Sequence, residues 1–187
     1  MTTEPMSNQD LLKIVEGLLF VAPGPVSIQQ LAAVMECSLA EVEQAVQQFQ
    51  DVCHGRGVRL QRLGQKVQLV TAPECTVYIE RLLGLSVSGK LSTPAMETLA
   101  IVAYRQPITR SEIEAIRGVN SDGVLRTLLS KGLVEEVGRL ETVGHPVLFG
   151  TTFEFLRFFG VEDIKDLPKL DLPEPGLPDD GNKTFQN

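Results

Sequence analysis

The sequence of 187 residues lacks the features that mark membrane and secreted proteins. No apolar run approaches the ~18 residues that a membrane-spanning helix needs. The N-terminus carries Glu4 and Asp10 instead of a basic patch followed by an apolar stretch, so it does not have the pattern of a secretory signal. We therefore expect a cytoplasmic protein that does not act at a membrane.

Cysteine and histidine are scarce, with three and two copies. Cys37, Cys53 and Cys75 form no C-x-x-C pair, which argues against a zinc site or a disulfide framework and favours buried free thiols. Neither His54 nor His145 is placed with a Cys or Ser in a way that suggests a base and its nucleophile. We predict no catalytic residues, no metal site and no cofactor.

The chain also lacks an excess of positive charge. Its formal net charge is −7, and residues 1–85 hold 6 basic and 9 acidic groups while residues 86–187 hold 11 and 15. DNA-binding domains usually carry a basic patch that neutralises phosphates. Neither half of the chain has the composition of such a domain.

What the sequence does contain is an internal repeat with an offset of 82 residues. Ser27 with Gln30, and Thr109 with Glu112, both have the spacing of a capping box, in which two side chains satisfy amides at a helix start. Two copies of one unit are the simplest explanation. The aligned positions are Pro25, Val26, Ser27, Gln30, Leu31, Val34, Ser38, Val42 and Val46 on Pro107, Ile108, Thr109, Glu112, Ile113, Ile116, Asn120, Val124 and Leu128.

Apolar periodicity predicts three helices and then a hairpin in each copy. In the first copy we expect helices over 8–21, from the Ser27 box and from the Ser38 box, strands around a turn at 63–66, and a last helix from a capping box at 71–74. In the second we expect helices from Thr93, with Pro94 at the first helical position, over 109–116 and around 124–129, strands at 133–137 and 146–149, and a last helix from a box at 151–154.

Three helices followed by a hairpin form the winged-helix variant of the helix-turn-helix plan. We therefore predict a mainly α protein with small β hairpins (α+β), made of two tandem winged-helix domains. The first domain spans 1–85 and the second spans 94–167, joined by a linker at 86–93. Residues 168–187 are rich in proline and are predicted to be a disordered tail.

Winged helices often bind DNA through the third helix, but this helix is poorly suited to DNA here. Between Ser38 and Asp51 there is no Lys or Arg, and the second copy offers only Arg126 and Lys131 against Asp122. Alternating charge on an exposed strand face explains the basic residues near the first wing equally well. These residues, the best candidates for DNA contact, are Arg56, Arg59, Arg62 and Lys66.

The second copy resembles a known family. The segments that carry the resemblance are Leu91–Pro94, Glu97–Thr109, Ile116–Asp122 and Phe149–Gly160. They look like the signature of the segregation and condensation protein B family, and the resemblance extends in plan over residues 8–170. One departure is His145, where the family usually has arginine in a Gly-Arg-Pro turn.

The resemblance implies a non-enzymatic subunit of the bacterial condensin. Such proteins form homodimers mainly through the first unit and bind the kleisin subunit, segregation and condensation protein A, largely with the second. The kleisin bridges the head domains of the SMC ATPase, so we expect a nucleoid-associated protein that touches DNA only indirectly or weakly. The alternative is a winged-helix transcription regulator, suggested by the fold plan and the arginines of the first wing.

By resemblance, Tyr104, Arg105 and Gln106 are candidates for kleisin contact. The alternative for Tyr104 is a half-buried ring with its hydroxyl at the rim of the core. Arg117 is a candidate for an exposed recognition turn, although Gly118 would equally serve as the left-handed residue that ends a helix.

The last predicted helix carries four aromatic residues in seven positions, more than one buried stripe can hold. We therefore expect at least one of them to face a partner. The predicted partner-binding members are Phe155, Phe158 and Phe159, and the fourth aromatic residue is Phe153.

Overall fold

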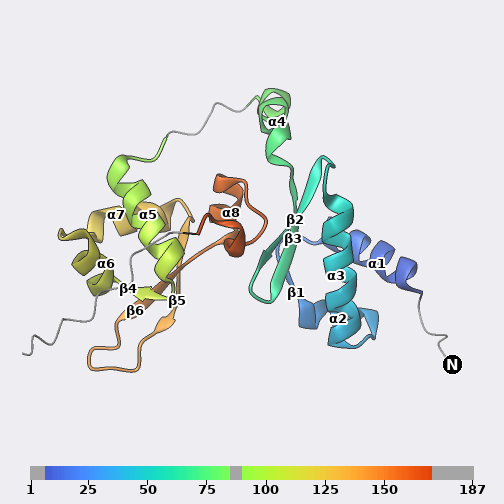
Figure 1. Ribbon diagram of the computed structural model, residues 1–187, viewed down its shortest axis with the longest axis horizontal. Coiled ribbons are helices and arrows are strands. Elements are labelled where there is room, and N and C mark those ends of the chain that lie inside the picture. The colour runs from blue at the N-terminus through green and yellow to red at the C-terminus, as the bar shows by residue number, and fades with distance from the viewer. Residues whose placement is uncertain (1–6, 85–89, 170–187) are drawn as a thin grey trace, which may run out of the picture.

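Two hydrophobic cores divide the chain into two units in the computed structural model, which describes residues 7–84 and 90–169 (Figure 1). Half of the predicted linker, residues 86–89, and nearly all of the predicted tail lie outside the described residues. Helices and small antiparallel sheets make up both units, which confirms the predicted α+β class. No helix among the residues described is long and apolar enough to span a membrane.

The first unit follows the winged-helix order of a helix, a short strand, two helices and two longer strands. Strands β2 and β3 form the hairpin expected from the sequence, and β1 also pairs with β3, so the wing is a three-stranded sheet in the order β1-β3-β2. The elements are α1 (Asn8–Val21), β1 (Val26–Ser27), α2 (Ile28–Met35), α3 (Leu39–Cys53), β2 (Val58–Leu63), β3 (Lys66–Thr71), the 3-10 helix η1 (Pro73–Cys75) and α4 (Thr76–Leu83).

The second unit repeats this order, with an equivalent sheet in the order β4-β6-β5. Its two-residue strand was missed for the same reason as β1, because a strand of two residues shows no alternation that a sequence pattern could reveal. The elements are α5 (Thr93–Arg105), β4 (Ile108–Thr109), α6 (Arg110–Arg117), α7 (Asp122–Ser130), β5 (Val134–Arg139), β6 (Val147–Thr151), α8 (Phe153–Phe159) and the 3-10 helix η2 (Ile164–Asp166).

The capping boxes at Ser27 and Thr109 are confirmed. The Ser27 hydroxyl accepts from the amide of Gln30 at 3.1 Å, and the Gln30 side chain accepts from the Ser27 amide at 2.9 Å. Thr109 and Glu112 make the same two bonds at 3.3 and 2.8 Å. Each cap residue also pairs with a wing strand, Ser27 with Lys66 and Thr109 with Leu148.

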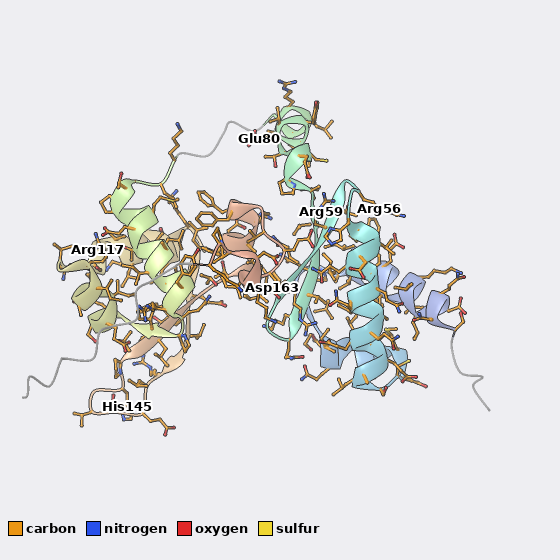
Figure 2. The ribbon with its side chains drawn as sticks, viewed as in Figure 1. Arg56, Arg59, Glu80, Arg117, His145 and Asp163 are labelled. Carbon is orange, nitrogen blue, oxygen red and sulfur yellow. The ribbon has the colours of Figure 1, made fainter. Side chains whose placement is uncertain are left out.

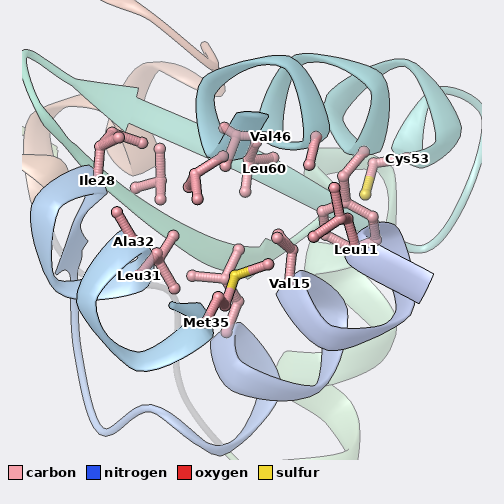
Figure 3. Packing of buried hydrophobic residues seen from close by; sticks show 14 residues of the cluster. Leu11, Val15, Ile28, Leu31, Ala32, Met35, Val46, Cys53 and Leu60 are labelled. Atoms are coloured by element: carbon pink, nitrogen blue, oxygen red, sulfur yellow. The ribbon is translucent and has the colours of Figure 1, made fainter. Parts of the chain in front are cut away.

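The first core is formed where α1, α2 and α3 pack on the inner face of the wing (Figure 3). Val15, Val42 and Leu60, from α1, α3 and β2, are fully buried. In the second unit Leu99, Ile113 and Leu128 come from the three corresponding helices and are also fully buried. Helix α8 adds Leu156 to that second core, which fixes α8 against its own unit.

Three predicted helix starts were wrong, whereas α1 has the predicted bounds. Thr71 ends β3 and Ala72 precedes η1 without a side-chain cap, because the strand extends further than expected. Thr151 ends β6, so Thr152 caps α8. The third shift is that Ser92 precedes α5, so Thr93 and Pro94 are its first two residues.

Candidate functional site

The C-terminal end of α5 holds three of the predicted partner-binding residues, and only one of them is wholly exposed. Tyr104 is half-buried and its hydroxyl donates to the carbonyl of Pro168 at 2.7 Å. The Gln106 side-chain oxygen accepts from the amide of Thr151 at 2.7 Å, which ties α5 to β6. Arg105 is exposed between them. The alternative of a half-buried Tyr104 is therefore confirmed, while the predicted partner contacts stay predictions.

An open groove of about 520 Å³ lies beside this end of α5. Ile164 and Leu167 contribute apolar side chains to it, and Arg105 and Lys169 contribute positive charge. Such a surface suits an apolar segment that carries acidic side chains. The structure therefore places Tyr104 and Arg105 together on one groove.

Arg117 does not lie on an exposed recognition turn. Its side chain is only 5% exposed, its Nη1 donates to the Ser121 hydroxyl at 2.9 Å, and both Nε and Nη2 donate to the Glu97 carboxylate at 3.2 Å. Gly118 has φ +72° and ends α6, as the second interpretation expected. Arg117 thus joins α5, α6 and the start of α7 (Figure 2).

Helix α8 divides the three predicted aromatic residues between core and surface. Phe155 is buried, whereas Phe158 and Phe159 are 45% and 39% exposed. The ring of Phe159 lies 4.8 Å from that of Phe155 and 5.3 Å from that of Phe158, measured between centroids. Two exposed aromatic rings in edge-to-face contact supply contact area at low entropic cost, which is typical of protein interfaces.

Arginines of the first wing are bonded to carboxylates. Arg59 is 12% exposed and its Nη2 lies 3.1 Å from Glu74, and Arg62 Nη2 lies 2.6 Å from Glu43. Arg56 and Lys66 are exposed, and the Arg56 carbonyl accepts from Arg59 (Figure 2). The prediction of DNA contact stays a prediction, with two of its four cations neutralised within the protein.

Charged side chains in the second unit make hydrogen bonds and ion pairs near the start of α7. Glu114 accepts from the Ser121 amide and from Arg110 Nε, both at 2.9 Å, and these bonds lower the pKa of its carboxyl, the amide bond most. Arg126 pairs with Asp122 at 2.8 Å within α7. His145 lies at the tip of the second wing (Figure 2).

Cys53 lies buried in the first core. Burial raises the pKa of the Cys53 thiol, which keeps it protonated and weakly nucleophilic at neutral pH. Within residues 7–84 and 90–169, no group of three or more His, Cys, Asp and Glu side chains is placed to hold a metal ion.

Sequence reasoning missed two further features. Helix α4 buries none of its residues and exposes Tyr78 and Leu82. The apolar residues of this helix can be seen in the sequence, but their exposure cannot. Gln61 and Glu162 join the two units, and no local pattern signals a contact between residues about a hundred positions apart.

Comparisons with known proteins agree on one family. Residues 13–170 match the family model of the segregation and condensation complex subunit ScpB. Segregation and condensation protein B of Moorella thermoacetica is 47% identical over 166 residues, covering 88% of this chain and 85% of the relative. The protein of the same name from Carboxydothermus hydrogenoformans is 42% identical over 174 residues, covering 92% and 93%.

Two solved structures are also similar in sequence. The crystal structure of ScpB from Mycobacterium tuberculosis is 38% identical and covers 84% of this chain and 99% of that one, with a TM-score of 0.42. A crystal structure of a dimer of an ScpB N-terminal domain complexed with an ScpA peptide is 35% identical. It covers 40% of this chain and 95% of that one, with a TM-score of 0.38.

The bonds of Arg117 predict a structural role. Arg117→Ala should lower the free energy of unfolding of the second unit by about 2 kcal/mol, because the hydrogen bonds of the buried guanidinium to Glu97 and Ser121 are lost. Arg105→Ala, the exposed control, should change it by less than about 0.5 kcal/mol. Urea titrations of both variants measure this, and equal stabilities would contradict the assignment.

Proposed function

The chain belongs to the ScpB family of segregation and condensation complex subunits, and we propose that it binds the kleisin ScpA as a homodimer. Proteins of this family are structural subunits of the complex, so the chain is not an enzyme. The function is to support chromosome condensation and segregation within a bacterial SMC complex. The SMC ATPase is engaged through the kleisin, which places the protein at the nucleoid.

The observation that best supports ScpA binding is the exposed pair of Phe158 and Phe159 on α8. Aromatic side chains of this exposure are enriched at the centres of interfaces, where they contribute most of the binding energy. The groove beside Tyr104 and Arg105 is formed partly by residues 164–169, which follow α8 in the chain. We propose that ScpA contacts both features.

We further propose a division of roles between the two units. The first unit carries the dimer contacts, and the second carries most of the ScpA contacts. The crystallised dimer of an N-terminal domain with an ScpA peptide describes a relative. For this chain, contact between ScpA and the first unit is therefore the alternative outcome of the binding experiment described below.

Direct DNA contact is proposed to be weak and without sequence preference. Three of the cations that could contact DNA form ion pairs with carboxylates of the protein. They are Arg59 and Arg62 of the first wing and Arg126 of the third helix of the second unit. Fluorescence anisotropy with a 30-bp duplex at 150 mM salt should give a Kd of about 10⁻⁵ M or weaker that weakens further as salt rises. Nanomolar, salt-resistant binding of one sequence would favour the transcription regulator instead.

Binding to ScpA is tested by co-purification of the full chain with ScpA, followed by calorimetric titration. Phe158→Ala with Phe159→Ala should weaken ScpA binding by about 30-fold, the loss expected for an interface hot spot. The variant should remain a dimer in analytical ultracentrifugation, because the change lies in the second unit. SMC heads should co-purify only when ScpA is present.

Val143→Ser is the matched control, since Val143 is a fully exposed apolar residue of the second wing. Its ScpA affinity should equal that of the unmodified chain. A monomeric chain that ignores ScpA would overturn the proposed function, and unchanged affinity in the double variant would move the ScpA site away from α8.

A further inference from the structure

The segment that follows α8 lies along the free edge of the first wing. In the order β1-β3-β2, strand β2 is an edge strand whose outward amides have no partner in the sheet. The Arg62 amide on this edge donates to the carbonyl of Glu162 at 2.8 Å. A backbone group of the second unit thus completes the hydrogen bonding of the first.

A buried side chain beside that bond also depends on the second unit. Gln61 is only 2% exposed, and its oxygen accepts from Gln68 at 3.1 Å within the wing. Its Nε2 donates to the carbonyl of Val161 at 2.9 Å. Because a buried amide without a partner is unfavourable, Gln61 is suited to a wing that is covered by residue 161.

The Glu162 carboxylate makes two more bonds to the first unit. One oxygen lies 3.4 Å from Arg59 Nε, and the other accepts from Gln50 Nε2 at 3.1 Å. The side chains of Arg59 and Glu162 are 12% and 17% exposed. Such partial burial shields an ion pair from the salt screening that weakens surface pairs.

Packing around the segment is close. Gly160 ends α8 with φ +68°, and a Cβ at this position would lie 3.1 Å from the ring of Pro73. Leu63, at the end of β2, packs against the second core. Figure 2 shows Asp163 between α8 and the first wing.

We propose that residues 160–163 form an interdomain clamp that fixes the angle between the two winged helices. Three independent kinds of contact converge on the clamp: the backbone bond to Arg62, the buried amide of Gln61 and the ion pair with Arg59. While the clamp is closed, the β2 edge cannot pair with another chain. The clamp does not depend on ScpA binding.

The test is amide hydrogen exchange of the full chain, followed by NMR at the Arg62 amide. In the unmodified protein this amide should be protected from exchange as long as its hydrogen bond to the Glu162 carbonyl of the other unit is intact. Glu162→Ala should speed its exchange at least tenfold, because loss of the Arg59 and Gln50 bonds lets the units separate.

Glu74→Ala is the matched control. Glu74 also pairs with Arg59 but belongs to the same unit, so its removal should change the exchange of Arg62 less than twofold. Gln61→Ala is a second clamp variant and should reproduce the effect of Glu162→Ala. The amides of Val46 and Leu99, one in each core, should keep their protection in all variants and so report intact folding.

Three results would overturn the clamp. They are an unprotected Arg62 amide in the unmodified chain, unchanged exchange in both clamp variants, and equal acceleration in Glu74→Ala and Glu162→Ala.

Discussion

The turn from short strand to helix, made once at Ser27 and once at Thr109, is the constraint on which both units depend. In each turn one residue pairs with a wing strand and also caps the following helix. A cap of this kind stabilises its helix by about 1 kcal/mol. Its larger effect is geometric, because it fixes the wing sheet relative to the second helix and leaves the three helices to enclose the core.

The same scaffold serves a protein-binding role because its cations are used internally. Arg117 joins three helices of the second unit, and Arg59 bonds to carboxylates of both units. These guanidinium groups stabilise the fold and are bonded within the protein instead of being free to contact phosphate. We propose that the exposed aromatic residues Phe158 and Phe159 supply the protein-binding surface instead.

Local signals in the sequence predicted much of the fold and less of the site. The Ser27 and Thr109 boxes were predictable because a cap needs two residues at a fixed spacing. The start of α8 was misplaced by one residue, since Thr151 and Thr152 are both capable caps and only the strand pairing of Thr151 with Val134 decides between them. The burial of Arg117 and the contacts of Glu162 depend on tertiary packing, so no spacing rule could reveal them.

We propose that the second winged helix binds protein through α8 and the end of α5. The most direct measurement is hydrogen exchange of the full-length dimer with and without ScpA, compared amide by amide. We expect new protection at residues 103–106 and 157–160, with little change along the exposed face of α7. Protection confined to α3 and α7, with α8 unchanged, would contradict it.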